Sequence, residues 1–310
     1  MANETTKTLM IGQAGAPIEA KAYLNRTDIE CVEIKDGVTA IGEVAFKGCS
    51  SLREIRIPAS VTEIGGAAFE FCISLKSADF PDGMKEIKGW VFHGCTSLET
   101  FVVPGSAKEI APGAFFGCSS LKSIAIPAGT AKIGAMAFVG CSSLESVVFP
   151  DGMKEIGGYA FRDCSALKEV VIPDSATEIG GMVFLGCESL ESVVLPASLE
   201  TIEKGTFMDC HSLASVILPG SLSEIGEDAF RSCKALRKIA LPDGLKRIGG
   251  NAFRNSGLRT ISLPSGVREV GAGAFAGCGE LETARLPQGL KATRVSQFRN
   301  CGKLKRILRC

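Results

Sequence analysis

The residues of this sequence with the most obvious capacity for chemistry are its 13 cysteines and two histidines. Cysteines that bind a metal stand at short spacings such as C-x-x-C, and no such spacing occurs in the sequence. Most of the cysteines instead recur at one period of 23 residues, at Cys49, Cys72, Cys95, Cys118, Cys141, Cys164, Cys187, Cys210 and Cys233, and again at Cys278 and Cys301. Stacked equivalents whose Cβ atoms point in parallel are poorly placed for disulfides, so we predict free, buried thiols with a structural role.

Two cysteines, Cys31 and Cys310, fall outside this spacing. Cys31 lies at an outward position of a predicted strand, which makes it the best candidate for a reactive thiol. The two histidines, His93 and His211, lie at variable positions beside a predicted turn, with no recurrent partner. The sequence therefore predicts no catalytic residues, no metal site and no cofactor, and we expect a protein that is not an enzyme.

Phenylalanine follows the same period as cysteine, three residues earlier in each repeat. One repeat, starting at Leu52, reads LREIRIPASVTEIGGAAFEFCIS. The segment L-x-x-I-x-I predicts a short strand that Pro58 ends, because proline cannot donate a ladder hydrogen bond. The segment I-G-x-x-A-F-x-x-C has nearly helical spacing and predicts a short helix or 3₁₀ turn on the opposite, convex side. Fourteen such strand segments run from Leu9 to Ile307.

The unit from Leu52 to Cys72 resembles the BspA-like class of leucine-rich repeats, and near-copies of it cover almost the whole chain. The resemblance implies an α/β repeat fold, a right-handed solenoid with a parallel sheet on its concave side. Known members are often surface or secreted proteins that bind host or matrix proteins. We expect one solenoid domain over 1–310, with a degenerate capping repeat at 1–28, regular 23-residue repeats over 29–303 and a basic terminal strand at 304–310. The shorter stretch from Asn255 to Leu258 predicts a local bend.

Composition excludes several classes of function. The chain has 34 basic and 34 acidic residues, so it has no overall positive field, and we expect no nucleic-acid partner. No stretch has the ~18 consecutive apolar residues of a membrane helix, and no basic segment with an apolar core opens the chain. The sequence as it stands favours a cytoplasmic protein, and a secreted or cell-surface protein if a leader was removed. The oligomeric state stays open, with a monomer favoured.

Two rows of outward residues follow the predicted strands. The first alternates in charge, which is typical of a self-compensating salt-bridge ladder. The second is aliphatic through its middle, which predicts either a contiguous exposed binding stripe or simply residues that suit strands. The charged row includes Lys76, Glu99, Lys122, Glu145, Lys168 and Glu191, and the aliphatic row consists of Val102, Ala125, Val148, Val171, Val194, Ile217 and Ala240.

The last 30 residues carry eight basic side chains and one acidic one. Such charge is typical of a terminal strand protected against edge-to-edge pairing, and it would equally suit an acidic partner. The candidate contacts there include Arg285, Lys305, Arg306 and Arg309, with Lys291 and Arg294 nearby in the sequence.

These features favour a non-enzymatic module that binds a protein partner on its concave face. The alternative is an adhesin-like surface protein that binds host or matrix proteins or glycans. The identity of the partner is not encoded in the sequence.

Overall fold

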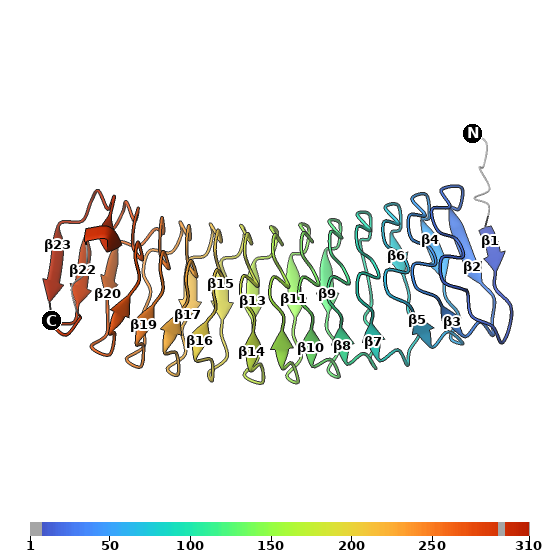
Figure 1. Cartoon of the computed structure of the whole chain (residues 1–310), viewed down its shortest axis with the longest axis horizontal. Coiled ribbons are helices and arrows are strands. Elements are labelled where there is room, and N and C mark those ends of the chain that lie inside the picture. Colours follow the sequence, from blue (N-terminus) through green and yellow to red (C-terminus); the bar gives the residue numbers. More distant parts are fainter. Residues whose placement is uncertain (1–7, 291–294, 310) are drawn as a thin grey trace. The chain divides into compact units, whose positions relative to one another are not determined.

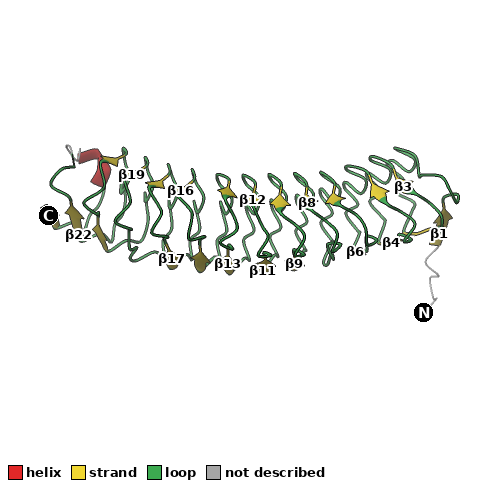
Figure 2. Cartoon of the chain, turned by 90° about the horizontal axis from the view of Figure 1, so that it is seen from below, coloured by secondary structure: helices red, strands yellow, loops and turns green. Residues whose placement is uncertain are grey.

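The computed structural model describes residues 8–290 and 295–309. The chain divides into two compact units, Met1–Met153 and Lys154–Cys310. In each unit the backbone winds as a right-handed solenoid, and its short strands are parallel and stand in two rows (Figure 1). Turns and loops make up most of the remaining backbone (Figure 2).

The first row of strands is formed by the L-x-x-I-x-I segments and presents one side to the core and the other to solvent. In the first unit, β1 to β6 of this row pair in one sheet and β9 pairs with β11, and in the second unit β13 to β17 and β20 to β23 form two further sheets. These strands are β1 (Thr8–Ile11), β2 (Cys31–Ile34), β4 (Glu54–Arg56), β6 (Ser77–Ala78), β9 (Ser123–Ala125) and β11 (Ser146–Val148), followed by β13 (Glu169–Val171), β15 (Ser192–Val194), β17 (Ser215–Ile217), β20 (Thr260–Ser262), β22 (Thr283–Leu286) and β23 (Arg306–Arg309).

Two of the fourteen predicted strand segments are not strands. Around Phe101 only an isolated bridge between Ser77 and Thr100 remains. The Phe101 ring occupies a position where neighbouring repeats have smaller side chains, and it packs 5.1 Å from the ring of Phe80. We attribute the break to the volume of this ring. The second break, at 238–241, precedes the shortened repeat, where the amide of Gly257 donates to the carbonyl of Cys233 at 3.1 Å.

The second row of strands was not predicted. It forms after the turn that follows each strand segment of the first row, at a pair of residues whose second member is isoleucine or valine, most often E-I, and every strand in it is two residues long. Its members are β3 (Ala40–Ile41), β5 (Glu63–Ile64), β7 (Glu86–Ile87), β8 (Glu109–Ile110) and β10 (Lys132–Ile133) in the first unit, and β12 (Glu155–Ile156), β14 (Glu178–Ile179), β16 (Thr201–Ile202), β18 (Glu224–Ile225), β19 (Arg247–Ile248) and β21 (Glu269–Val270) in the second.

The prediction of short helices on the convex side is wrong for nearly every repeat. The A-F-x-x-C segments are chains of tight turns, and the described residues contain one helical element, the 3₁₀ helix η1 (Val295–Phe298), red in Figure 2. The backbone explains the difference. Val44 has a left-handed φ of 51°, which an α-helix does not contain. The amide of Ala45 then donates to Gly42 at 3.3 Å, but the amide of Phe46 donates to Ala68 of the next coil at 2.8 Å.

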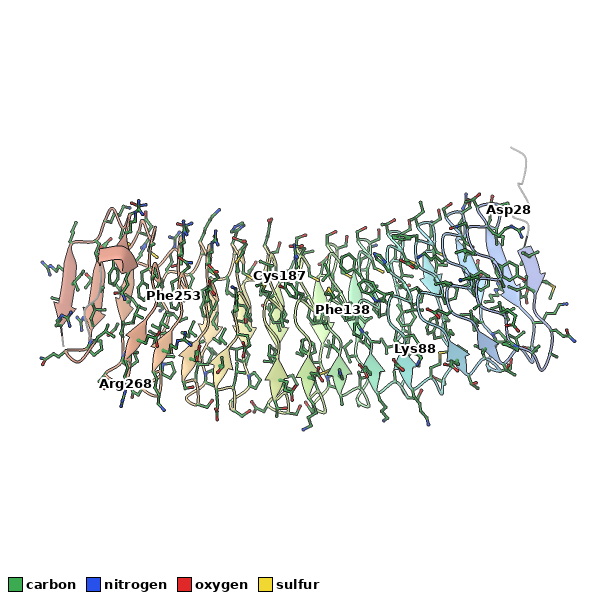
Figure 3. All side chains as sticks on the ribbon, viewed as in Figure 1. Asp28, Lys88, Phe138, Cys187, Phe253 and Arg268 are labelled. Atoms are coloured by element: carbon green, nitrogen blue, oxygen red, sulfur yellow. The ribbon has the colours of Figure 1, made fainter. Side chains whose placement is uncertain are left out.

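The core of each unit is a column of stacked phenylalanine rings. Phe115 and Phe138 lie 5.1 Å apart with planes 2° from parallel in the first unit, and Phe253 and Phe275 lie 5.5 Å apart at 2° in the second. All four are fully buried, as is Cys187. Figure 3 labels Phe138 in the first unit and Cys187 and Phe253 in the second. Stacked aromatic pairs contribute ~0.5 to 1.5 kcal/mol beyond their buried area, so each coil stabilises the next.

Candidate interaction surfaces

The aliphatic row faces solvent in both units. In the first unit the side chains of Val102 and Val148 are 72% and 66% exposed, whereas Val147, the adjacent residue in β11, is 8% exposed. Ala125, also exposed, pairs in register with Val148 across β9 and β11. Alternation along the strand places Val147 in the core and Val148 outside it.

The second unit carries the other part of the row. Val171, Val194 and Ile217 pair in register across β13, β15 and β17. They are 63%, 40% and 65% exposed, and Ala240 further along is exposed as well. Three adjacent strands of this unit therefore present a contiguous aliphatic surface. We call the seven residues Val102, Ala125, Val148, Val171, Val194, Ile217 and Ala240 the aliphatic row.

The charged row contains cross-strand ion pairs. Glu99 and Lys122 approach to 3.5 Å, and the earlier pair Glu30 and Arg53 to 3.9 Å, and all four side chains are largely exposed. Exposed pairs of this kind contribute ~0 to 1 kcal/mol. The ladder arrangement predicted from alternating charge thus holds for these pairs. Further along the row the side chains of Glu145, Lys168 and Glu191 are exposed.

The basic residues near the end of the chain are exposed, including Arg285 on β22 and Lys305, Arg306 and Arg309 in or next to β23. The ammonium group of Lys303 lies 2.8 Å from Oε1 of Glu280. Its hydrogen bond and positive charge lower the pKa of the Glu280 carboxyl group. Lys291, Arg294 and Cys310 lie outside the described residues.

We call the cysteines that recur every 23 residues the ladder cysteines. In the described part of the chain the prediction of free, buried thiols is confirmed for them, although Cys301 is half-buried. The thiol of Cys72 donates to the carbonyl oxygen of Phe46 at 3.1 Å, and that of Cys141 to Phe115 at 3.2 Å. Burial raises the pKa of both thiols. Cys31 is half-buried, and burial followed by the nearby carboxylates of Glu54 and Glu30 raises its pKa too, so its surroundings do not favour a reactive thiolate.

His93, which the sequence left without a partner, has one in the structure. Its Nδ1 lies 3.0 Å from Oε1 of Glu70, whose Oε2 accepts from Lys47 at 2.7 Å. Three aromatic rings surround the imidazole. Their centroids lie 4.7 Å (Phe71), 5.2 Å (Trp90) and 5.1 Å (Phe116) from the centroid of the imidazole ring. Sequence analysis missed this group because its members come from different coils. The signal that was available is that Phe71 and Trp90 occupy repeat positions where neighbouring repeats have glycine or small residues.

Residues 8–290 and 295–309 contain no group of three or more His, Cys, Asp or Glu side chains placed to hold a metal ion. The Asp174 carboxylate accepts the backbone amide of Ala197 at 2.7 Å, so it stabilises a turn between coils. No helix within the described ranges is long and apolar enough to cross a membrane.

Comparison with known families identifies the repeat. The pattern described as the BspA type Leucine rich repeat region matches residues 16–145, 131–256 and 223–309, in six copies. The chain belongs to the BspA-type leucine-rich repeat family. A comparison with curated proteins gave no match.

Solved structures of other proteins agree with this fold. A leucine-rich repeat protein from Bacteroides ovatus is 28% identical with a TM-score of 0.72, over 100% of this chain and 94% of that chain. A leucine rich cell surface protein from Faecalibacterium prausnitzii is 25% identical with a TM-score of 0.50, over 97% of this chain and 78% of that one. The pneumococcal vaccine antigen PcpA, at 20% identity and a TM-score of 0.56, covers 97% of this chain and 82% of that one, and shares the fold.

Proposed function

We propose that this chain is a non-enzymatic interaction module that binds a protein partner through the aliphatic row. The observation that carries the proposal is the exposure of large aliphatic side chains within each unit, with Val148 at 66% in the first and Ile217 at 65% in the second. Exposed apolar patches with polar surroundings are typical of protein-binding surfaces. Three members of the row follow an exposed charged residue by three positions, since Val148 follows Glu145, Val171 follows Lys168 and Val194 follows Glu191. In this proposal the charged side chains supply the polar rim.

Membership of a leucine-rich repeat family supports this proposal, because stacked repeats supply a long surface on which outward residues are free of core packing. The basic residues Arg285, Lys305, Arg306 and Arg309 are a second candidate contact, for an acidic partner. Binding at that end would weaken strongly with added salt, whereas binding to the aliphatic row would not.

A pull-down from cells of the native organism tests the proposal, with Val148→Ser, Val171→Ser and Val194→Ser combined in one variant. Ile73→Ser is the matched control, because Ile73 is 45% exposed and lies on a turn outside the row. We expect one or more proteins to be retained by the wild type and the control but lost with the triple variant. Equal retention by all three folded proteins would overturn the proposal.

A surface adhesin is the second candidate function. It is favoured by the similarity to the Faecalibacterium prausnitzii protein, which is described as a cell surface protein. Protease treatment of intact cells tests it. Degradation of this chain while a cytosolic marker survives would support surface display, and complete protection would contradict it.

A further inference from the structure

The turn side of the first unit carries an exposed aromatic group that the proposed function does not use. Phe71, Trp90 and Phe116 surround His93, and we call these four residues the aromatic frame. Trp90 and Phe116 also approach each other at 5.8 Å. Phe71 is 43% exposed and Trp90 37% exposed. The frame therefore presents flat apolar rings to solvent on a different side of the coil from the aliphatic row.

Folding of the repeat does not require aromatic residues at these positions. Phe71 and Trp90 both adopt a left-handed φ of 59°, which is unfavourable for bulky side chains. Each of these residues is followed, 23 residues later, by a glycine at the same repeat position. The glycine is Gly94 for Phe71 and Gly113 for Trp90. These glycines leave room for the rings, since a Cβ on Gly113 would lie 2.6 Å from Cε3 of Trp90. The rings thus lie over the next coil at positions where most repeats use smaller side chains.

His93, the polar member of the frame, is held in place by Glu70, which is itself paired with Lys47. Lys47 holds Oε2 of Glu70 at 2.7 Å, and Oε1 of Glu70 lies 3.0 Å from Nδ1 of His93. A carboxylate accepts only, so in the neutral imidazole the proton lies on Nδ1 and the lone pair on Nε2. The Glu70 side chain is 12% exposed and that of His93 is 23% exposed. The frame thus combines two partly exposed aromatic side chains with one oriented hydrogen-bond acceptor.

These features select the chemistry of a ligand. The charge of Glu70 is already compensated by Lys47, so the frame has no unpaired charge with which to attract an ion. A neutral pyranose sugar fits better, because its C–H face is apolar and flat while its rim carries hydroxyl groups. We propose that the aromatic frame is a binding site for a neutral glycan, with a sugar ring stacked on Trp90 or Phe71 and a hydroxyl group donating to Nε2 of His93.

Trp90 is the single tryptophan of the chain, so its fluorescence reports on the frame alone. The wild type is titrated with the neutral hexasaccharides cellohexaose and maltohexaose, after screening on an array of neutral glycans. We expect a saturable change in Trp90 fluorescence with at least one neutral glycan. Absence of binding to every neutral glycan at millimolar concentration would overturn the proposal. A proline-rich peptide is titrated in parallel, and binding of that peptide but of no glycan would also overturn it.

Matched variants decide whether the frame is the site. Phe71→Gly and Trp90→Gly introduce the residue that Gly94 and Gly113 supply in the next coil, so the fold tolerates them. Tyr159→Gly is the control, because Tyr159 has the same repeat position and a φ of 60° but lies outside the frame. By calorimetry we expect each frame variant to weaken glycan binding about tenfold, as loss of an aromatic stack predicts. Equal affinity in all three variants would place the glycan elsewhere and overturn the proposal.

The outcome is distinguishable from that of the proposed protein-binding function. The combined Val148→Ser, Val171→Ser and Val194→Ser variant retains the whole frame. It should therefore lose the protein partner and keep glycan binding. Loss of glycan binding in that folded variant would contradict the assignment of the glycan to the frame.

Discussion

The thiol of Cys95 donates a hydrogen bond to the backbone carbonyl oxygen of Phe69, which lies 3.0 Å away and 26 residues earlier in the chain. The same oxygen accepts the amide of Cys72 at 3.1 Å. The cysteine ladder therefore joins each coil to the previous one through buried donors. This role explains why a small residue with a polar hydrogen recurs at the position, and it needs the thiols to stay protonated.

The first prediction concerns pH. Burial raises the pKa of the ladder thiols above the ordinary 9.0, to about 11 for Cys49 and Cys278. In the unfolded chain the thiols ionise near 9, so above that pH the unfolded state binds fewer protons than the folded state. The stabilising contribution is fully present below the unfolded pKa and is lost as pH rises toward 11. We expect the free energy of unfolding, measured by urea denaturation, to fall between about pH 8 and pH 10.

Cys95→Ala provides the control for this effect. Removing one buried thiol should reduce the pH slope by up to about 1.4 kcal/mol per pH unit. A wild-type stability that stays constant over the interval would show that the thiols are not buried as described.

The second prediction concerns the shortened repeat. A Cβ on Gly257 would collide with the carbonyl group of Lys234, and a backbone group cannot move aside cheaply. Gly257→Ala should therefore lower the free energy of unfolding by about 2 kcal/mol or more. Gly105→Ala is the control, because a Cβ there meets nothing within 4 Å. Equal stability of the two variants in thermal denaturation would contradict the close approach at Gly257.

The core of the fold was predictable from the sequence, because phenylalanine and cysteine repeat at one period and because inward and outward residues alternate along each strand. The turns were not. The spacing of Ile41, Ala45 and Phe46 is compatible with a helix, and what prevents one is the left-handed φ of Val44. Valine rarely adopts this conformation, so its residue type predicts the opposite. That the whole chain forms one domain, with 1–28 as a degenerate first repeat, stays a prediction.

Of the candidate surfaces, one was predictable from the sequence and one was not. Exposure of the aliphatic row followed from alternation, since Val147 and Val148 must point in opposite directions. The aromatic frame did not follow, because the contacts of His93 come from three successive coils, through Phe71, Trp90 and Phe116. Only the path of the turns brings those positions together.

The third prediction tests how Trp90 packs on its neighbour. Gly113→Ala places a methyl group 2.6 Å from the indole, so the ring must move. The left-handed φ itself is tolerated by alanine in the equivalent Ala67. We therefore expect a loss of about 1 to 2 kcal/mol and a shift of the Trp90 emission maximum. In a Trp90→Gly background the same substitution should cost less than about 1 kcal/mol. An equal cost in both backgrounds would mean that the ring does not lie on Gly113.

The last prediction separates the two faces of one strand. Val147 is 8% exposed and Val148 is 66% exposed. Val147→Ser removes apolar atoms from the core and buries a hydroxyl group, so the free energy of unfolding should fall by about 2 to 3 kcal/mol. Val148→Ser changes a solvated position and should cost less than about 1 kcal/mol, chiefly through strand preference. Urea denaturation of the two variants side by side measures the difference. If Val148→Ser were as destabilising as Val147→Ser, the aliphatic row would be part of the packing of the repeat, and a partner would have no exposed surface there to bind.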